Sequence, residues 1–188
     1  MRNTLIIMGI FVVLSYKAQQ IFPLNTSALD APVGSYFKDL DDELSYYTGT
    51  WDATFQNKTI TLQISKQIKV PIKRFQKNFY RDLLFVRYEV KKNGVVSEST
   101  LNKDFTNNSQ LSIESTYTQD NGNSITLLFS GGNCSVGIGT INLKKINTTQ
   151  FSWGYYPGTT TRIDTLCPPD KEYKIHLPET ENLIFTKQ

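Results

Sequence analysis

The residues that could carry out chemistry in this 188-residue chain are few. His176 is the only histidine, nine positions after Cys167, and Cys134 is the only other cysteine. A nucleophile needs an adjacent base, and a zinc site needs several His or Cys ligands, so the composition leaves little material for either. We therefore expect no catalytic residue, no metal ion and no cofactor.

Four acidic residues stand close together at Asp39, Asp41, Asp42 and Glu43. Such a cluster could hold calcium or supply the paired carboxylates of a glycosidase. It lacks the alternating Asp-x-Asp-x-Asn-Gly order of a calcium loop, and acids at the start of a helix interact favourably with the helix dipole. We interpret the cluster as helix capping.

A basic segment between positions 58 and 92 could bind an anion. It carries ten Lys and Arg residues against Asp82 and Glu89. Three explanations are open: a solvated face, a site for an anionic envelope glycan or lipid headgroup, and a nucleic-acid surface. The candidate anion-binding residues are Lys66, Lys69, Lys73, Arg74, Lys77 and Arg81.

The N-terminal segment matches a secretory signal peptide. Arg2 precedes an apolar run from Leu5 to Leu14, and a polar region follows. This run is too short for a membrane-spanning helix, which needs roughly 20 apolar residues. We predict that residues 1–18 are a signal peptide, a buried N-terminal helix or strand being the alternative. The chain is then exported to the periplasm, the outer-membrane surface or the outside of the cell.

Removal of residues 1–18 would lower the positive charge. The full chain has 20 basic and 17 acidic residues, and loss of Arg2 and Lys17 leaves 18 against 17, or +1. Near-zero charge and export both argue against a nucleic-acid partner. Export also favours a disulfide between Cys134 and Cys167, because exported chains meet an oxidising environment; two free buried thiols are the alternative.

Apolar side chains alternate with polar ones along most of the remaining chain, as in half-buried strands. Asn93-Gly94 between two such segments is a strong hairpin signal. The expected strands cover residues 51–56, 60–65, 84–91, 95–101, 111–117, 125–129, 141–143, 151–155 and 183–185. The pattern predicts an all-β fold, an antiparallel up-and-down barrel of eight or nine strands, with a sandwich as the alternative.

The segments that flank the strands differ from them. Four apolar residues at helical spacing predict one short N-terminal helix that closes an end of the barrel. These residues are Phe37, Leu40, Leu44 and Tyr47. Residues 19–35 read as an extended leader, and the proline-rich residues 157–182 as an irregular crossing. Residues 36–188 are therefore expected to form a single β-barrel domain.

Three short motifs carry a resemblance to a known family. They are Tyr36-Phe37-Lys38-Asp39-Leu40, Tyr47-Thr48-Gly49-Thr50-Trp51 and Leu183-Ile184-Phe185-Thr186-Lys187. Together they resemble a family of small exported bacterial proteins of unknown function, over nearly all the mature chain. Members of that family often carry a lipoprotein cysteine near the position of Tyr16, which this chain lacks. The Gly-x-Trp motif is also similar to that of lipocalins and fatty-acid-binding proteins.

The resemblance to lipocalins implies a role for Trp51 at the closed end of the barrel. In that family a Trp packs there beneath a basic side chain, a cation–π contact worth about 0.5 to 2 kcal/mol. The residues that the resemblance assigns to this barrel floor are Gly49, Trp51, Arg162 and Lys187. The alternative for Trp51 is the wall of a ligand cavity.

Aromatic side chains that face inward could line such a cavity. They are Trp51, Phe55, Tyr88, Tyr117, Phe129, Trp153 and Tyr155. The leading hypothesis is a monomeric, non-catalytic, lipocalin-like barrel that binds an apolar or amphipathic small molecule. With a filled core, the alternative is an envelope module that binds a protein, a glycan or a lipid headgroup. A secreted hydrolase is the second alternative, disfavoured because its acids would fall on the outward face. Those acids are Asp52, Glu89, Glu98 and Glu114.

Overall fold

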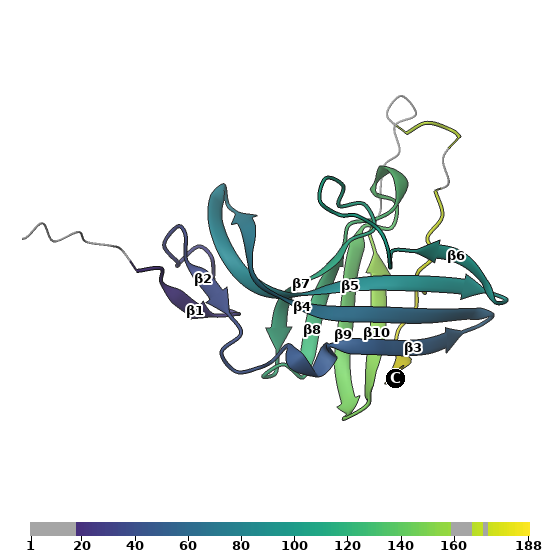
Figure 1. Cartoon of the computed structure of the whole chain (residues 1–188), viewed down its shortest axis with the longest axis horizontal. Coiled ribbons are helices and arrows are strands. Elements are labelled where there is room, and N and C mark those ends of the chain that lie inside the picture. The colour runs from purple at the N-terminus through teal and green to yellow at the C-terminus, as the bar shows by residue number, and fades with distance from the viewer. Residues whose placement is uncertain (1–17, 159–166, 171–172) are drawn as a thin grey trace, which may run out of the picture.

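The computed structural model describes residues 18–158, 167–170 and 173–188, and β-strand dominates them (Figure 1). The strands are β1 Ile21–Pro23, β2 Tyr36–Lys38, β3 Gly49–Phe55, β4 Lys58–Arg74, β5 Lys77–Lys92, β6 Val95–Ser99, β7 Ile113–Gln119, β8 Ser124–Phe129, β9 Gly139–Asn147, β10 Gln150–Pro157 and β11 Leu183–Lys187. Two 3-10 turns, η1 Ser45–Tyr47 and η2 Asn133–Ser135, interrupt the connections.

Eight strands of the described residues close into an antiparallel barrel. Its order is β3, β4, β5, β7, β8, β9, β10 and β11, so neighbours along the chain lie side by side, with β6 outside the ring. Two short pairings complete the closure: Phe85 and Val86 of β5 pair with β7, and Thr186 and Lys187 of β11 pair with β3. The predicted all-β up-and-down barrel is confirmed.

The alternation in the sequence accounts for the inner face of the barrel. Ile60, Leu62 and Ile64 of β4 are buried, whereas the residues between them are not. The same period of two places Ile141 and Leu143 of β9 inside. Side chains of this kind from all eight strands form one continuous hydrophobic core.

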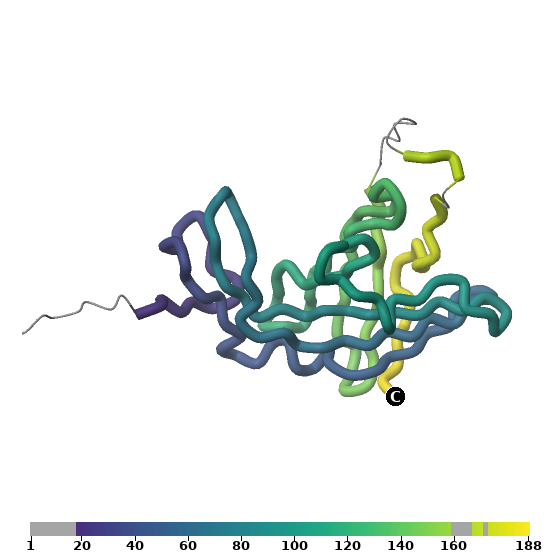
Figure 2. The backbone as a smooth tube through the Cα atoms, turned by 45° about the horizontal axis from the view of Figure 1, so that its top comes forward, coloured from purple at the N-terminus to yellow at the C-terminus, as the bar shows by residue number. Residues whose placement is uncertain are grey.

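The β4–β5 hairpin is longer than the barrel and extends beyond it. Its far end curves away from the barrel, and β1 and β2 lie beside it (Figures 1 and 2). A bulge between Gln67 and Val70 interrupts the β4–β5 register at this bend. Beyond the bend, β2 pairs in parallel with Tyr80 and Arg81 of β5, and a small second apolar cluster forms around Phe37 and Phe79.

The predicted N-terminal helix is replaced by other structure. Phe37 lies in β2, and only the single 3-10 turn Ser45–Tyr47 follows before β3. The carboxylate of Asp39 accepts hydrogen bonds from the backbone N–H groups of Glu43 (2.8 Å) and Leu44 (3.2 Å). Asp39 therefore caps a loop rather than an α-helix, because the strand pairing of Phe37 has already fixed the chain before it.

The prediction that Tyr117 faces the interior is wrong. A bulge between Ser115 and Tyr117 adds one residue to β7 relative to β8. Beyond it the alternation is reversed, so that Thr118 is buried and Tyr117 is 44% exposed. A one-residue slip exchanges the two faces of a strand, and alternation in the sequence does not reveal where the slip occurs.

Two predictions fall on residues outside the described part of the chain. These are residues 1–17 of the predicted signal peptide and Arg162 of the predicted barrel floor. In the described ranges, no helix has both the length and the apolar character that crossing a membrane requires.

Candidate functional site

Aromatic rings fill the interior where the sequence suggested a ligand cavity. Trp51, Tyr88, Phe129, Trp153 and Tyr155 are all 3% exposed or less. They pack on one another and on neighbouring rings, with centroids 5.9 Å apart for Phe129 and Tyr155 and 6.4 Å apart for Trp153 and Tyr155. The indole N–H of Trp153 donates to a backbone oxygen, that of Pro178, at 3.2 Å. Phe55 is only partly buried at the edge of this cluster.

Trp51 lies at one end of the barrel between aromatic rings and a lysine. Its indole N–H donates to the carbonyl of Tyr47 at 2.8 Å, and its ring centroid is 4.5 Å from that of Phe151. The ammonium nitrogen of Lys187 lies 5.1 Å from the Trp51 ring. Gly49, at φ +119°, leaves room for the lysine stem, since a Cβ there would stand 3.2 Å from its Cε.

Several titratable side chains form hydrogen bonds elsewhere along the barrel strands. The hydroxyl of Tyr88 donates to Glu98 at 2.7 Å, and Tyr155 donates to the carbonyl of Gly137. Burial raises the pKa of both phenols, so they remain neutral hydrogen-bond donors at ordinary pH. Lys58 donates to a backbone carbonyl at 2.9 Å, and burial lowers the pKa of its ammonium group.

Two of the six basic candidates are engaged within the protein. The ammonium nitrogen of Lys66 lies 2.6 Å from a carboxylate oxygen of Asp39. Partial burial alone would lower the pKa of Lys66, but its hydrogen bond and ion pair with Asp39 raise it. Lys69 places its ammonium nitrogen 5.8 Å from the ring centroid of Tyr36 and 5.6 Å from that of Tyr80. These contacts attach the curved hairpin to its neighbours.

Three other candidates, Lys73, Arg74 and Arg81, line a cavity of about 270 Å³, which we call the basic groove. Its lining residues are Pro71, Ile72, Lys73, Arg74, Arg81, Leu83, Ser109, Ser112, Glu114, Ser115, Thr116, Leu128 and Ser130. The groove thus lies between the curved end of the hairpin and β7 and β8. Lys77 is absent from this lining.

Arg81 stands out in the basic groove. Its Nε atom is buried and has no hydrogen-bond partner within the described residues. Burial, and after it the positive charge of Arg74, lower the pKa of Arg81 to about 10. Glu114 contributes a carboxyl to the lining; burial raises its pKa and Arg74 acts in the opposite direction.

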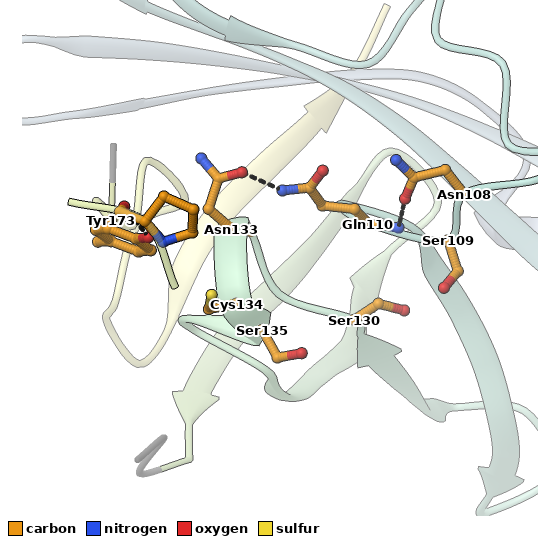
Figure 3. Close-up of a pocket in the computed structure, with 10 residues that line it drawn as sticks. Asn108, Ser109, Gln110, Ser130, Asn133, Cys134, Ser135 and Tyr173 are labelled. Carbon is orange, nitrogen blue, oxygen red and sulfur yellow. Dashed lines mark hydrogen bonds between the residues drawn. The ribbon is translucent and has the colours of Figure 1, made fainter. Parts of the chain in front are cut away.

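A second cavity, of about 460 Å³, adjoins the basic groove; we call it the polar pocket (Figure 3). Its lining residues are Asn108, Ser109, Gln110, Ser130, Gly132, Asn133, Cys134, Ser135, Pro168 and Tyr173. Gln110 donates to the side-chain oxygen of Asn133 at 2.8 Å, and its backbone N–H donates to Asn108 at 2.8 Å. Ser109 and Ser130 line both cavities, so the two are neighbours.

The polar pocket is built around a disulfide. Cys134 in η2 is bonded to Cys167, which confirms the predicted pairing. The bond attaches residues 167–170, including Pro168, to the turn that follows β8, and the hydroxyl of Tyr173 donates to the Pro168 carbonyl. The disulfide therefore holds one wall of the pocket against the other.

Family comparison covers the whole chain. The model of a family described as "Family of unknown function (DUF6705)" matches residues 1–188. The chain belongs to this family. Comparisons with curated proteins and with solved structures gave no match. Membership of DUF6705 agrees with the resemblance to a family of unknown function and brings no ligand or reaction with it.

Most of the polar pocket in this DUF6705 protein was missed from the sequence. A usable signal existed in two polar runs, 107–110 (NNSQ) and 130–135 (SGGNCS), which are unusually rich in amides and hydroxyls. The strand pairing of β7 with β8 brings them together. Among the described residues, no group of three or more His, Cys, Asp or Glu side chains is placed to hold a metal ion.

Proposed function

We propose that this protein is an exported, non-catalytic module that binds a saccharide on the outside of a filled barrel. The observation that carries the proposal is the polar pocket, in whose described lining seven of ten side chains carry an amide or a hydroxyl group. Its volume of about 460 Å³ falls within the range of ordinary ligand sites, roughly 300 to 1,000 Å³.

The chemistry of the pocket suits a ligand with many hydroxyl groups. A sugar hydroxyl both donates and accepts hydrogen bonds, and the side-chain amides of Asn108, Gln110 and Asn133 can do the same. Ser109 and Ser135 add hydroxyls to this wall. The side chains of the described lining carry no charge, so they suit a neutral, hydrated ring better than a fatty acid or a lipid tail.

Two features support export. The disulfide between Cys134 and Cys167 is of a kind that persists in oxidising compartments outside the cytoplasm. Residues 1–18 have the basic start and apolar run of a signal peptide. A saccharide of the cell envelope or its surroundings is then the natural ligand.

The interior is the less favoured binding place. An apolar ligand there would have to displace rings that already contact one another, such as Phe129 and Tyr155. A hydrolase would need two carboxylates facing one site. Among the described residues, the lining of the basic groove has one acid, Glu114, and that of the polar pocket has none. We therefore propose a binding role rather than a catalytic one.

The test is a binding titration on full-length protein, expressed with its own N-terminal segment and purified from the exported fraction. Backbone amide resonances are followed by NMR while a panel of neutral and acidic oligosaccharides is added. We expect saturable shifts at Gln110 and Asn133. The variant Asn133→Ala should bind roughly tenfold more weakly, because one or two hydrogen bonds are lost.

A matched control is Asn102→Ala, which removes the same amide from an exposed loop position outside both cavities. It should bind like the parent protein. The proposal fails if no saccharide in the panel shifts the resonances of the polar pocket, or if the shifts occur at inward residues such as Trp153 instead.

A further inference from the structure

Arg81 is a charged donor that lacks an acceptor. Its Nε atom is buried and has no hydrogen-bond partner among the described residues, and the guanidinium group forms no ion pair with an acid of those residues. Burial of a charged donor without a partner is unfavourable, so such a group indicates a missing acceptor.

The nearest acids do not supply that acceptor. Asp82, the next residue, is 2% exposed, and its carboxylate already accepts hydrogen bonds from three donors. These are the hydroxyl of Tyr36 at 2.5 Å and the backbone N–H groups of Asp39 at 3.1 Å and Lys69 at 2.9 Å. Asp82 and Glu43 attract Arg81 only through space.

A second arginine stands in the same groove. Arg74 lies near enough for its charge to oppose that of Arg81, and Lys73 lines the groove beside it. Arg74 and Arg81 repel each other around this cavity of about 270 Å³. The carboxyl of Glu114 in the lining attracts Arg74, but among the described residues it forms no ion pair with either arginine. The guanidinium group is the side chain best suited to hold a carboxylate, sulfate or phosphate with two parallel hydrogen bonds.

Hydroxyl groups complete the lining. Ser112 and Ser130 lie with their hydroxyl oxygens 2.7 Å apart, and Thr116 donates to a backbone carbonyl at 3.1 Å. Ser130 also belongs to the polar pocket. The basic groove and the polar pocket therefore share a boundary, so one extended ligand could reach both.

We propose that Arg81 and Arg74 form an anion subsite that binds the carboxylate, sulfate or phosphate substituent of an acidic saccharide. The saccharide part of this assignment rests on the proposed function, whereas the anion part rests on the groove alone. The protein then selects acidic over neutral saccharides.

The first experiment tests the anion alone. Sodium sulfate is titrated into full-length exported protein at constant ionic strength, with chloride as the reference salt, while the Nε–H resonance of Arg81 is followed by NMR. A saturable shift is expected, and Arg74→Gln should weaken sulfate binding roughly tenfold because a charge-assisted hydrogen bond is lost. Absence of a saturable shift for sulfate, phosphate and acetate alike would overturn the subsite.

The variants separate binding from folding. Arg81→Gln should abolish sulfate binding, and Arg81→Lys should restore part of it, provided that both retain the dispersed spectrum of the parent. Lys92→Gln, at the opposite end of β5 and exposed, removes one positive charge outside the groove and should leave the affinity unchanged. If Lys92→Gln and Arg74→Gln weakened sulfate binding equally, the effect would come from net charge alone, and this would contradict the subsite.

The second experiment compares a uronic-acid oligosaccharide with its methyl ester. We expect the acid to bind roughly tenfold more tightly, and Arg81→Gln to remove only that difference. Equal binding of acid and ester refutes the anion subsite but leaves the saccharide proposal standing. If sulfate binds at Arg81 but no saccharide binds to the protein, the anion subsite stands and the proposed function fails.

Discussion

Lys187 and Trp51 pair across β11 and β3, and the lysine ammonium nitrogen lies 5.1 Å from the indole ring. This contact occurs at one of the two short strand pairings that close the barrel. The contact therefore links β11, the last strand of the barrel, to β3, the first. Trp51 is also held by the hydrogen bond from its indole N–H to the carbonyl of Tyr47, in the turn before β3.

Loss of this contact should weaken the barrel modestly. Lys187→Gln is expected to lower the free energy of unfolding by about 0.5 to 1 kcal/mol, the usual value of an exposed cation–π pair. Gly49→Ala should cost about 1 to 3 kcal/mol, because alanine is strained at φ +119°. Urea denaturation gives both values, with Lys144→Gln on the outside of β9 as the control. A Gly49→Ala variant as stable as the parent would contradict this reading of the floor.

The packed interior predicts that truncation of two adjacent leucines of β8 has effects of very different size on the free energy of unfolding. Leu127 is 0% exposed and Leu128 is 44% exposed. Leu127→Ala should lower the free energy of unfolding by about 2 to 5 kcal/mol, since it opens a cavity in the core. Leu128→Ala should change it by less than about 0.5 kcal/mol. Similar values for the two variants, measured by thermal or urea denaturation, would mean that the interior is not filled.

The disulfide should contribute strongly to stability. It joins residues separated by 33 positions, and in the chain-entropy model closure of such a loop is worth about 3 to 4 kcal/mol. The double variant Cys134→Ser, Cys167→Ser should lose that amount in urea denaturation. Reduced parent protein should match the double variant, and a loss below about 1 kcal/mol in both would show that the bond does not restrain the unfolded chain as expected.

Stability should fall at alkaline pH, in part through Tyr36. Burial and the hydrogen bond to Asp82 raise the pKa of Tyr36 from 10.0 to about 12. The folded state therefore holds this proton more tightly than the unfolded state, so the contribution is complete below pH 10 and is lost as the pH rises from 10 to 12. Between pH 10 and pH 12 the free energy of unfolding of the Tyr36→Phe variant should fall less steeply with pH than that of the parent protein, by up to about 1.4 kcal/mol per pH unit. Parallel slopes in the two proteins would contradict the predicted shift.

The sequence predicted the strands well because their pattern is local. Buried and exposed residues alternate within β4, and Asn93-Gly94 forms the turn between β5 and β6 as the hairpin signal indicated. The failures arose where a distant contact overrode the local pattern. Phe37 pairs with Arg81 in a strand rather than entering a helix, and the bulge in β7 turns Tyr117 outward.

The candidate site was predictable only in part. Lys73, Arg74 and Arg81 were identified by charge alone, but nothing in the sequence separated them from Lys66, which forms an ion pair with Asp39. The groove depends on the bend of the hairpin and on its position against β7 and β8. Pairings between residues far apart in the chain determine both, so a linear pattern does not reveal them.

The most direct test of the account is a crystal structure of the protein bound to an acidic oligosaccharide. We expect the sugar ring in the polar pocket against Gln110 and Asn133, the charged substituent within hydrogen-bond distance of Arg81, and the barrel interior unchanged. A ligand held inside the barrel among Tyr88, Phe129 and Tyr155, or bound on another face with both cavities empty, would contradict the account.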